Sequence, residues 1–324
     1  MLPVAVDAMG GDNAPAAILA GAHDAVAAGI PVLLVGPEGL DGVGDIPLLH
    51  ASEVIEMDED PAGSVRRKKD STLVRCAEAV RDGKASAMIS AGNTGATMAS
   101  ALLRMGRIKG VARPAIATAV PVPGSTPTVL LDSGANAEVS VEWLAQFAIM
   151  GSVYSRQRFG IENPRVGLLS IGEEPGKGDT LRKEGFELLS RTKGINFIGN
   201  IEGRDLMTTE VDVAVTDGFT GNVVLKTLEG SLKTVIKSLF AAFASTPEMQ
   251  AHADALMPAL LPMYEQFDPD TYGGAILLGI DGVCIISHGS SSPRAMLNGI
   301  KVAKEMVDCD MVGSIRTALA SLAD

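Results

Sequence analysis

Short aliphatic runs that alternate with alanine-rich stretches constrain the fold of this chain more than any other feature. Strands buried on both faces are continuously apolar, and their alternation with helices indicates right-handed crossovers and a largely parallel sheet. We therefore predict a doubly wound α/β fold. The predicted strands are residues 2–6, 31–35, 87–90, 115–120, 128–131, 166–170, 196–201 and 211–216, and the predicted helices include 16–28, 73–81, 94–105 and 139–158.

Polar segments with glycines follow several of these strands, where folds of this kind bind ligands. The first contains Asp7, Gly10, Gly11 and Asp12, ahead of a helix that Asp12 or Asn13 is expected to cap. Turn amides and the free N–H groups of a first helical turn bind anions there, and the helix dipole favours negative charge. An ordinary capped turn is the alternative, because the segment matches no nucleotide-binding fingerprint.

Two further segments repeat this arrangement. Asn93 and Thr94 follow the predicted strand 87–90 and begin a helix, and Asn136 lies in the polar segment after strand 128–131. Because the carboxyl ends of parallel strands meet at one edge of a sheet, we expect these segments to share that edge and to bind one anion together.

Positively charged residues near such segments are candidates for contacting the anion. Arg66 and Lys68 belong to a run of four cations, which is either an anion contact or a solvated charged surface. Lys177 lies between glycines, a setting that fits a ligand contact and a plain surface turn equally.

Two other segments carry polar side chains of the kinds that enzymes use in catalysis. Asn222 and Lys226 are one helical turn apart, after the predicted strand 211–216. His288 ends an apolar run and precedes three serines, where it is either structural or catalytic.

The composition argues against several classes of protein. Hydrophobic residues make up 46% of the chain, which argues against disorder, and a net charge of −12 argues against a nucleic-acid partner. The three cysteines form no CxxC, the histidines show no paired metal spacing, and GxSxG, GxxxxGK and GxGxxG motifs are lacking. We therefore expect no metal, no cofactor and no protein nucleophile. The cysteine usage and the lack of a basic leader favour a cytosolic location.

Residues 231–272 depart from the α/β pattern. An apolar stripe at spacings of three and four runs from Leu232 to Phe243, and a second apolar run is interrupted by Pro258 and Pro262. Two helical pieces with this much apolar surface predict a protrusion, and a helix hairpin packed into a dimer or core is the ordinary alternative. We predict a single α/β unit over residues 1–324 with this helical excursion, and two closely joined lobes are the alternative.

Taken together, seven segments resemble the bacterial phosphate acyltransferase family. Their order along the chain makes the resemblance specific, although each segment alone is not. The segments are residues 7–12, 66–71, 90–95, 132–136, 200–205, 216–222 and 287–290.

The resemblance implies a homodimeric enzyme with a Rossmann-like α/β/α fold that moves a long-chain fatty acyl group from acyl carrier protein to inorganic phosphate. The acyl phosphate would serve phospholipid synthesis through a membrane acyltransferase that acylates glycerol 3-phosphate. It also implies a cytoplasmic protein held at the inner face of the cell membrane by the protrusion. Residues 231–272 hold two lysines and five acidic residues, a net charge of −3, so we expect membrane contact that is weak and largely insensitive to salt.

Phosphate is already an anionic nucleophile at neutral pH, so positioning and charge stabilisation would supply most of the catalysis. His288 is the candidate for protonating the departing thiolate. The predicted phosphate-binding residues are Asp7, Gly10, Gly11, Asp12, Arg66, Lys68, Asn93, Thr94 and Asn136, and the predicted catalytic residues are Lys177, Asn222, Lys226 and His288.

Two other functions fit the same sequence. A phosphotransacetylase-like enzyme acting on short acyl-CoA would use a similar anion site, and a membrane-associated scaffold could retain the fold without catalysis. An acidic carrier protein would also need a local basic patch on this acidic chain. The candidates for that patch are Arg66, Arg67, Arg104, Arg107 and Lys109.

Overall fold

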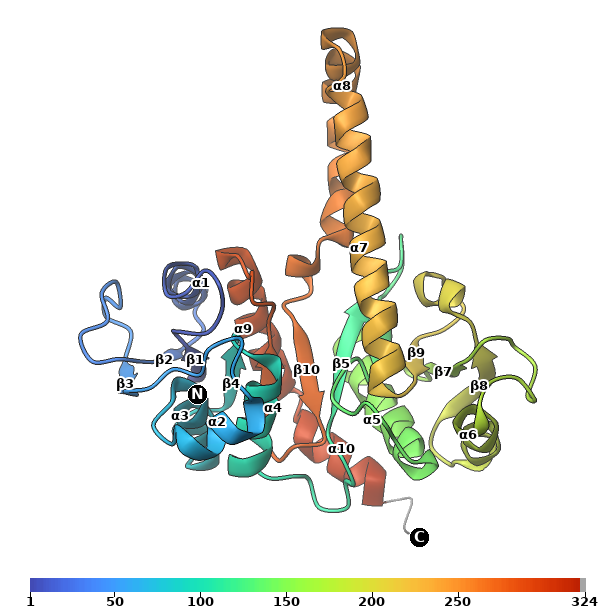
Figure 1. Ribbon diagram of the computed structural model, residues 1–324, viewed down its shortest axis with the longest axis horizontal. Coiled ribbons are helices and arrows are strands. Elements are labelled where there is room, and N and C mark those ends of the chain that lie inside the picture. The colour runs from blue at the N-terminus through green and yellow to red at the C-terminus, as the bar shows by residue number, and fades with distance from the viewer. Residues whose placement is uncertain (321–324) are drawn as a thin grey trace.

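The chain forms one mixed β-sheet with helices on both faces (Figure 1). The computed structural model describes residues 1–320. Seven of the ten strand pairings there are parallel, which confirms the predicted α/β architecture with a mostly parallel sheet.

All eight predicted strands are present, each within two residues of its predicted ends. Of the other three strands, β11 is the apolar run that precedes His288, and the short strands β3 and β10 were not predicted. The strands are β1 (Val4–Asp7), β2 (Val32–Gly36), β3 (Leu48–His50), β4 (Ala87–Ser90), β5 (Ala115–Val120), β6 (Thr128–Leu131), β7 (Arg165–Leu169), β8 (Asn196–Ile201), β9 (Val213–Val215), β10 (Ala275–Leu278) and β11 (Val283–Ile286).

The four predicted helices are α1, α3, α4 and α5. The helices are α1 (Ala16–Ala27), α2 (Pro61–Arg67), α3 (Thr72–Arg81), α4 (Thr94–Arg104), α5 (Val141–Phe159), α6 (Thr180–Arg191), α7 (Gly218–Phe243), α8 (Pro247–Phe267), α9 (Pro293–Asp308) and α10 (Met311–Ala320), with 3-10 helices η1 (Gly203–Met207) and η2 (Pro269–Thr271).

The sheet contains two sets of parallel strands that run in opposite directions. The strand order is β3-β2-β1-β4-β11-β10-β5-β6-β9-β7-β8, and the pairings β11–β10, β10–β5 and β5–β6 are antiparallel. Three reversals in succession leave β6, β9, β7 and β8 antiparallel to β1, β4 and β11. The expectation that all glycine-bearing segments share one edge is therefore wrong, because the carboxyl ends of the two sets lie at opposite edges of the sheet.

The hydrophobic core lies on both faces of the sheet. One face is covered by α1, α5, α6, α9 and α10. The other face is covered by α2, α3 and α4 over the first set of strands, and by the start of α7 over the second set. The first turns of α7 thus lie on the same face as α4, on the other side of the central strands (Figure 1).

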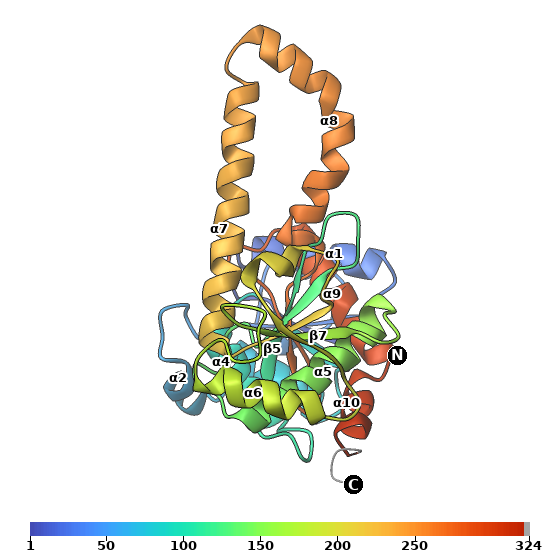
Figure 2. The same ribbon diagram turned by 90° about the vertical axis from the view of Figure 1, so that its right-hand side faces the viewer.

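Helices α7 and α8 form a hairpin that projects from the body (Figure 2). This is the predicted protrusion, but α7 begins at Gly218 rather than near residue 231, and α8 continues through Pro258 and Pro262. Asp217 explains the early start, because its carboxylate accepts the Thr220 N–H at 2.8 Å and caps the helix directly after β9. No helix within residues 1–320 combines the length and the apolar composition that crossing a bilayer requires.

Candidate active site

Three loops that follow β1, β4 and β11 touch one another, and we call residues 8–13, 91–93 and 287–291 the first loop group. The Asp12 N–H donates to the Gly289 carbonyl at 2.7 Å. A Cβ on Gly10 would lie 2.8 Å from the Gly92 nitrogen, and one on Gly11, whose φ is +102°, would lie 2.8 Å from the Gly289 oxygen. Glycine is therefore required for this close approach of three backbones.

Asn13 does not cap α1 as expected. Its side-chain amide instead donates to the Ser290 carbonyl at 3.2 Å and the Ser291 carbonyl at 3.3 Å. Pro15 precedes α1 without a side-chain cap. The amide group thus ties the loop after β1 to the loop after β11.

Asp7 lies beneath the first loop group and is 1% exposed. The Ser90 hydroxyl donates to Asp7 Oδ2 at 2.7 Å and accepts the Gly92 N–H at 2.9 Å, while the Met9 N–H donates to Asp7 Oδ1 at 3.2 Å. Burial raises the pKa of this carboxyl above its usual value, and the hydrogen bond from Ser90 opposes that rise. Asp7 therefore orients the loop backbone from below.

Several backbone N–H groups of the first loop group are available to a ligand. Within residues 1–320, those of Gly11, Gly289 and Ser290 donate no hydrogen bond. Thr94 is the exposed first residue of α4, whose N-terminus begins at this loop group. Unpaired N–H groups at loops and at a helix start are a common basis for binding an anion.

Asn93 caps α4, as the sequence predicted. Its Oδ1 accepts the Ala96 N–H at 3.0 Å, and its Nδ2 donates to the carbonyls of Met57 at 3.0 Å and Glu59 at 3.1 Å. The side chain therefore holds residues 56–59 against the start of α4. Only its backbone N–H is left to contact an anion.

Of the two predicted cations Arg66 and Lys68, the lysine has partners in the structure and the arginine has no ion pair within residues 1–320. Lys68 Nζ donates to the Val54 carbonyl at 2.6 Å and pairs with Glu59. Hydrogen bonds from the Glu56 N–H and from Lys68 hold the pKa of Glu59 at about 2. Arg66 is exposed on α2 and forms no ion pair within residues 1–320.

A second loop group follows β6, β7 and β9 and comprises residues 132–136, 170–179 and 216–218. Asp132 is buried and accepts the N–H groups of residues 116, 134, 135 and 136, and burial raises its pKa. Asn136 Nδ2 donates to Asp132 Oδ2 at 2.9 Å and to the Pro114 carbonyl at 2.8 Å. The predicted ligand Asn136 thus fixes the loop after β6.

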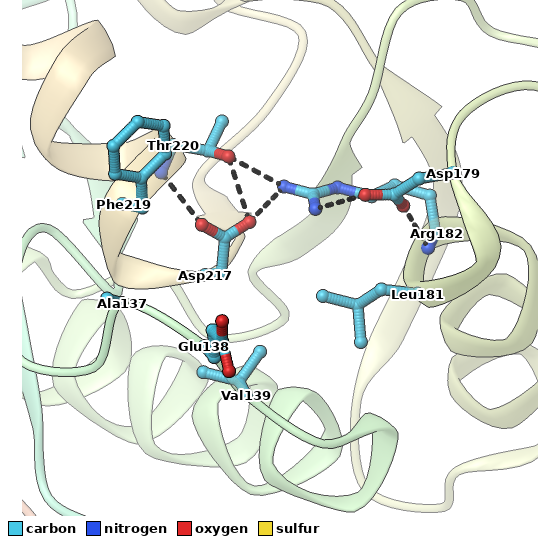
Figure 3. Close-up of a pocket in the computed structure, with 9 residues that line it drawn as sticks. All are labelled: Ala137, Glu138, Val139, Asp179, Leu181, Arg182, Asp217, Phe219 and Thr220. Carbon is cyan, nitrogen blue, oxygen red and sulfur yellow. Dashed lines mark hydrogen bonds and ion pairs between the residues drawn. The ribbon is translucent and has the colours of Figure 1, made fainter.

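A cavity of about 590 Å³ lies beside this second loop group, between the starts of α6 and α7. Figure 3 shows the residues that line it. Its charged wall is the pair Arg182–Asp217, whose side chains are 9% and 8% exposed. Arg182 also donates to the hydroxyls of Thr216 at 2.8 Å and Thr220 at 3.1 Å. Burial raises the pKa of Asp217, but Thr220 and Arg182 outweigh it, so that the net shift is downward. Arg182 was not predicted as a site residue, because nothing in its helical sequence context separates it from a surface arginine.

The predicted catalytic residues lie at three places. Lys177 is exposed on the loop after β7, in the second loop group, and its ammonium has no partner within residues 1–320. Asn222 lies one turn into α7, with its Cβ 3.7 Å from where a Cβ on Gly134 would be. Lys226 follows on the next turn of α7, and His288 belongs to the first loop group.

Glu229 joins two of these residues and was missed in the sequence. Its Oε1 lies 3.2 Å from His288 Nε2 and its Oε2 lies 2.9 Å from Lys226 Nζ. Asn222, Lys226 and Glu229 share one face of α7 at spacings of four and three, so that spacing was the available signal. Residues 218–229 of α7, which we call the α7 root, connect the second loop group to the first over about 16 Å.

The comparisons with known proteins agree with this fold. Residues 2–313 match the family model described as fatty acid synthesis protein. Relatives named phosphate acyltransferase include those of Elusimicrobium minutum, 47% identical over 98% of this chain and 96% of the relative, and Bacillus subtilis, 46% identical over 97% and 96%.

Solved structures with a similar fold include a phosphotransacetylase from Streptococcus pyogenes, with a TM-score of 0.63 at 16% identity over 94% of both chains. A branched-chain phosphotransacylase from Enterococcus faecalis has a TM-score of 0.61 at 15% identity, over 95% of this chain and 99% of that one. At these identities the likeness concerns the Rossmann-like fold.

An α/β fold with this degree of similarity to known proteins defines an acyltransferase of fatty acid synthesis. More particularly, the chain belongs to the phosphate acyltransferase family, whose members transfer an acyl group to phosphate. The resemblance noted in the sequence is thereby confirmed, and an enzyme is favoured over a non-catalytic scaffold.

Proposed function

We propose that this enzyme transfers a long-chain fatty acyl group from acyl carrier protein to inorganic phosphate, and that the acyl phosphate is used in phospholipid synthesis. The observation that carries the proposal is the first loop group, where three glycine-bearing loops meet with unpaired N–H groups in a chain of this family. Phosphate bound there needs no protein nucleophile, because it attacks the thioester itself.

In this proposal the first loop group binds the phosphate. The backbone at Gly10, Gly11 and Asp12 and the N–H groups at Asn93 and Thr94 surround the anion, while Asp7 fixes the loops from below. The supporting feature is that all of these groups lie at the ends of β1 and β4, which pair directly.

The α7 root carries the catalytic groups toward that phosphate. Lys226 and His288 meet at Glu229 beside the first loop group, and Asn222 lies one turn nearer the second. Lys177, with the adjoining loop, is the candidate for contacting the acyl donor from the second loop group, since its ammonium is exposed and unpaired within residues 1–320.

An acidic carrier protein fits best against α2. Arg66 and Arg67 are exposed at its C-terminal end, and Asn93 holds the loop that leads into α2 at the first loop group. Two of the other basic candidates are more engaged, since Arg104 pairs with Glu78 at 3.6 Å and Arg107 donates to a backbone carbonyl, while Lys109 is exposed and lies outside α2. Electrostatic complementarity at α2 would guide the carrier protein to the site.

The acyl donor that the enzyme prefers distinguishes the proposed reaction from its alternatives. The full chain is incubated with palmitoyl acyl carrier protein or with acetyl-CoA, with and without phosphate, and free thiol and acyl phosphate are measured. We expect phosphate-dependent thiol release with the carrier protein and much less with acetyl-CoA. Preference for acetyl-CoA would replace this proposal with a phosphotransacetylase-like one, and no phosphate-dependent release with either donor would favour the scaffold.

The hairpin of α7 and α8 is the candidate for a weak contact with the inner face of the cell membrane, near the enzyme that consumes acyl phosphate, and for contact within a homodimer. Val235, Leu256 and Leu261 are among its exposed apolar side chains. Residues 231–272 have a net charge of −3, so apolar insertion rather than charge attraction would supply the binding.

Vesicle sedimentation tests the membrane contact. We expect weak binding to anionic vesicles that changes little between low and high salt, and less binding for a Leu256→Ser, Leu261→Ser variant. Strong binding that disappears in salt would contradict an apolar contact. Sedimentation velocity of the same samples measures the oligomeric state.

A further inference from the structure

Glu229 lies where α7 meets the first loop group, and both of its carboxylate oxygens are engaged. Oε1 is 3.2 Å from His288 Nε2 and Oε2 is 2.9 Å from Lys226 Nζ. Its side chain is 27% exposed, against 48% for His288. Burial raises the pKa of Glu229, but the hydrogen bonds from His288 and Lys226 outweigh it, so that the net shift is downward and the carboxylate stays charged at neutral pH.

The backbone at His288 is fixed independently of its ring. The His288 carbonyl accepts the Ser291 N–H at 3.0 Å and the Ser291 hydroxyl at 2.5 Å. Within residues 1–320, the ring itself has one hydrogen-bonding partner, Glu229. The carboxylate therefore decides which ring nitrogen faces α7 and which is free.

A carboxylate beside Nε2 accepts a hydrogen bond from the Nε2–H group, which leaves Nδ1 as the nitrogen that can take up a proton. Lys226, Glu229 and His288 are the charged or titratable groups that meet at this contact, and Asp12 lies close to Gly289 in the neighbouring loop.

The reaction needs one proton to move. An oxygen of hydrogen phosphate forms a bond with the thioester carbonyl carbon, the carbon–sulfur bond breaks, and the sulfur leaves with its electron pair as a thiolate. The products are acyl phosphate and thiol, so the proton that hydrogen phosphate loses is the one that the thiolate gains. A single group that accepts and then donates this proton balances the reaction without another reactant.

We propose that Glu229 is a positioning residue that holds His288 with Nε2 toward α7, so that Nδ1 carries this proton from phosphate to the departing sulfur. The proposal rests on the proposed function, because it needs a thioester donor and phosphate. It adds a residue that acts through His288, and it ties the proton transfer to α7.

The experiment compares Glu229→Gln, Glu229→Ala and His288→Ala with the matched control Glu184→Gln, an exposed carboxylate on α6. Initial rates are measured with palmitoyl acyl carrier protein at varied phosphate. We expect kcat to fall by about 100-fold for His288→Ala and Glu229→Ala and by about 10-fold for Glu229→Gln, with the KM for phosphate changed less than about twofold. The double variant Glu229→Ala, His288→Ala should be no slower than His288→Ala, because both changes remove the same step.

A second acyl donor distinguishes a role of Glu229 in proton transfer from a purely structural role. The palmitoyl thioester of 4-nitrothiophenol releases a thiolate that needs no protonation at neutral pH. With this donor, the rates of all three variants should return to within about threefold of the unchanged chain. A circular dichroism spectrum and a urea midpoint for each variant report on folding.

Three results would overturn the inference: a kcat for Glu229→Ala near that of the unchanged chain, losses that multiply in the double variant, or the same loss with the nitrothiophenol donor. Failure of the proposed function looks different, because the unchanged chain itself would then lack phosphate-dependent thiol release.

Discussion

Replacing Arg182 by leucine tests whether the buried ion pair at the start of α7 sets the stability of this half of the molecule. The substitution keeps an apolar stem of similar bulk and removes the guanidinium from Asp217, Thr216 and Thr220. Both partners are less than a tenth exposed, so water cannot replace the lost donor at Asp217.

Removing one partner of a buried pair typically costs about 3–5 kcal/mol of unfolding free energy, because it leaves an uncompensated charge. Asp217 retains hydrogen bonds from the Thr220 N–H and hydroxyl, which places Arg182→Leu near the lower end, about 3 kcal/mol. In the double variant Arg182→Leu, Asp217→Ser no charge is buried and serine can still cap α7, so we expect the loss to shrink to about 1–2 kcal/mol.

Urea denaturation followed by fluorescence of Trp143, the single tryptophan, measures these differences. Arg191→Leu, an exposed arginine on the same helix without an ion pair within residues 1–320, should change stability by less than about 0.5 kcal/mol. A loss below about 1 kcal/mol for Arg182→Leu, or a double variant less stable than the single one, would refute the reasoning.

The loss of stability in Arg182→Leu depends on pH in a direction that the pKa of Asp217 predicts. In the unchanged chain the pKa of Asp217 is lowered, so its contribution is present at neutral pH and lost as pH falls through that lowered value. In Arg182→Leu the burial remains and the cation is gone, which moves the pKa of Asp217 upward and favours the protonated form. The stability deficit of the variant should therefore be largest at pH 7 and shrink toward pH 4.

Three further substitutions, one of them with a control, test other parts of the structure. Gly10→Ala places a Cβ 2.6 Å from Asp7 Oδ2 and 2.8 Å from the Gly92 nitrogen, so we expect the KM for phosphate to rise at least about tenfold in a steady-state assay. Gly230→Ala, where a Cβ meets open space on α7, is its control and should add about 0.5–1 kcal/mol of stability. Asn93→Ala removes the α4 cap and releases residues 56–59, with a loss of about 1–3 kcal/mol in urea and faster proteolysis of that loop. Lys68→Met should be less stable than the unchanged chain at pH 7, and the part of the difference that comes from the ion pair with Glu59 should be lost as pH falls from 4.5 to about 2, because Glu59 is protonated over that range. The part that comes from the hydrogen bond to the Val54 carbonyl should remain, and a difference that is the same at pH 7 and pH 2 would show that the ion pair does not contribute.

The sequence predicts most of the sheet because its strands are buried on both faces and therefore continuously apolar. The exceptions are physical. β3 is short and lies at the edge of the sheet, where its residues are half-buried or exposed, so no apolar run marks it. β10 follows Gly273 and Gly274, both with positive φ, and its four residues were not predicted as a strand although they are apolar like those of β4 and β6.

The direction of the strands affected the predicted site more than the two missed strands did. Alternation of strands and helices indicates parallel pairing, but the reversal at β10 and β6 depends on tertiary pairings that no local pattern reveals. The loops after β1 and β4 do converge as predicted, and the loop after β11 joins them, whereas Asn136 and Lys177 lie with the second loop group. Whether these residues have the predicted roles stays a prediction.

Side-chain roles were harder to predict than loop positions. Asn93 and Lys68 have the polar groups that phosphate binding uses, yet neighbouring backbone carbonyls and Glu59 occupy them. Glu229 became visible only when α7 was seen to begin at Gly218, because its helical register with Asn222 and Lys226 then places all three on one face.

Because α7 is one continuous helix, a deletion near its start has a different effect from a deletion near its end. Successive residues of an α-helix are rotated by about 100° about its axis. Deleting one residue of the α7 root before Glu229 would therefore rotate Glu229 away from His288. A deletion near the tip, beyond Phe243, leaves that register untouched. The far end of the hairpin can thus vary in length without moving Glu229 while the near end cannot, and shortened hairpins for crystallisation or engineering should be cut at the tip.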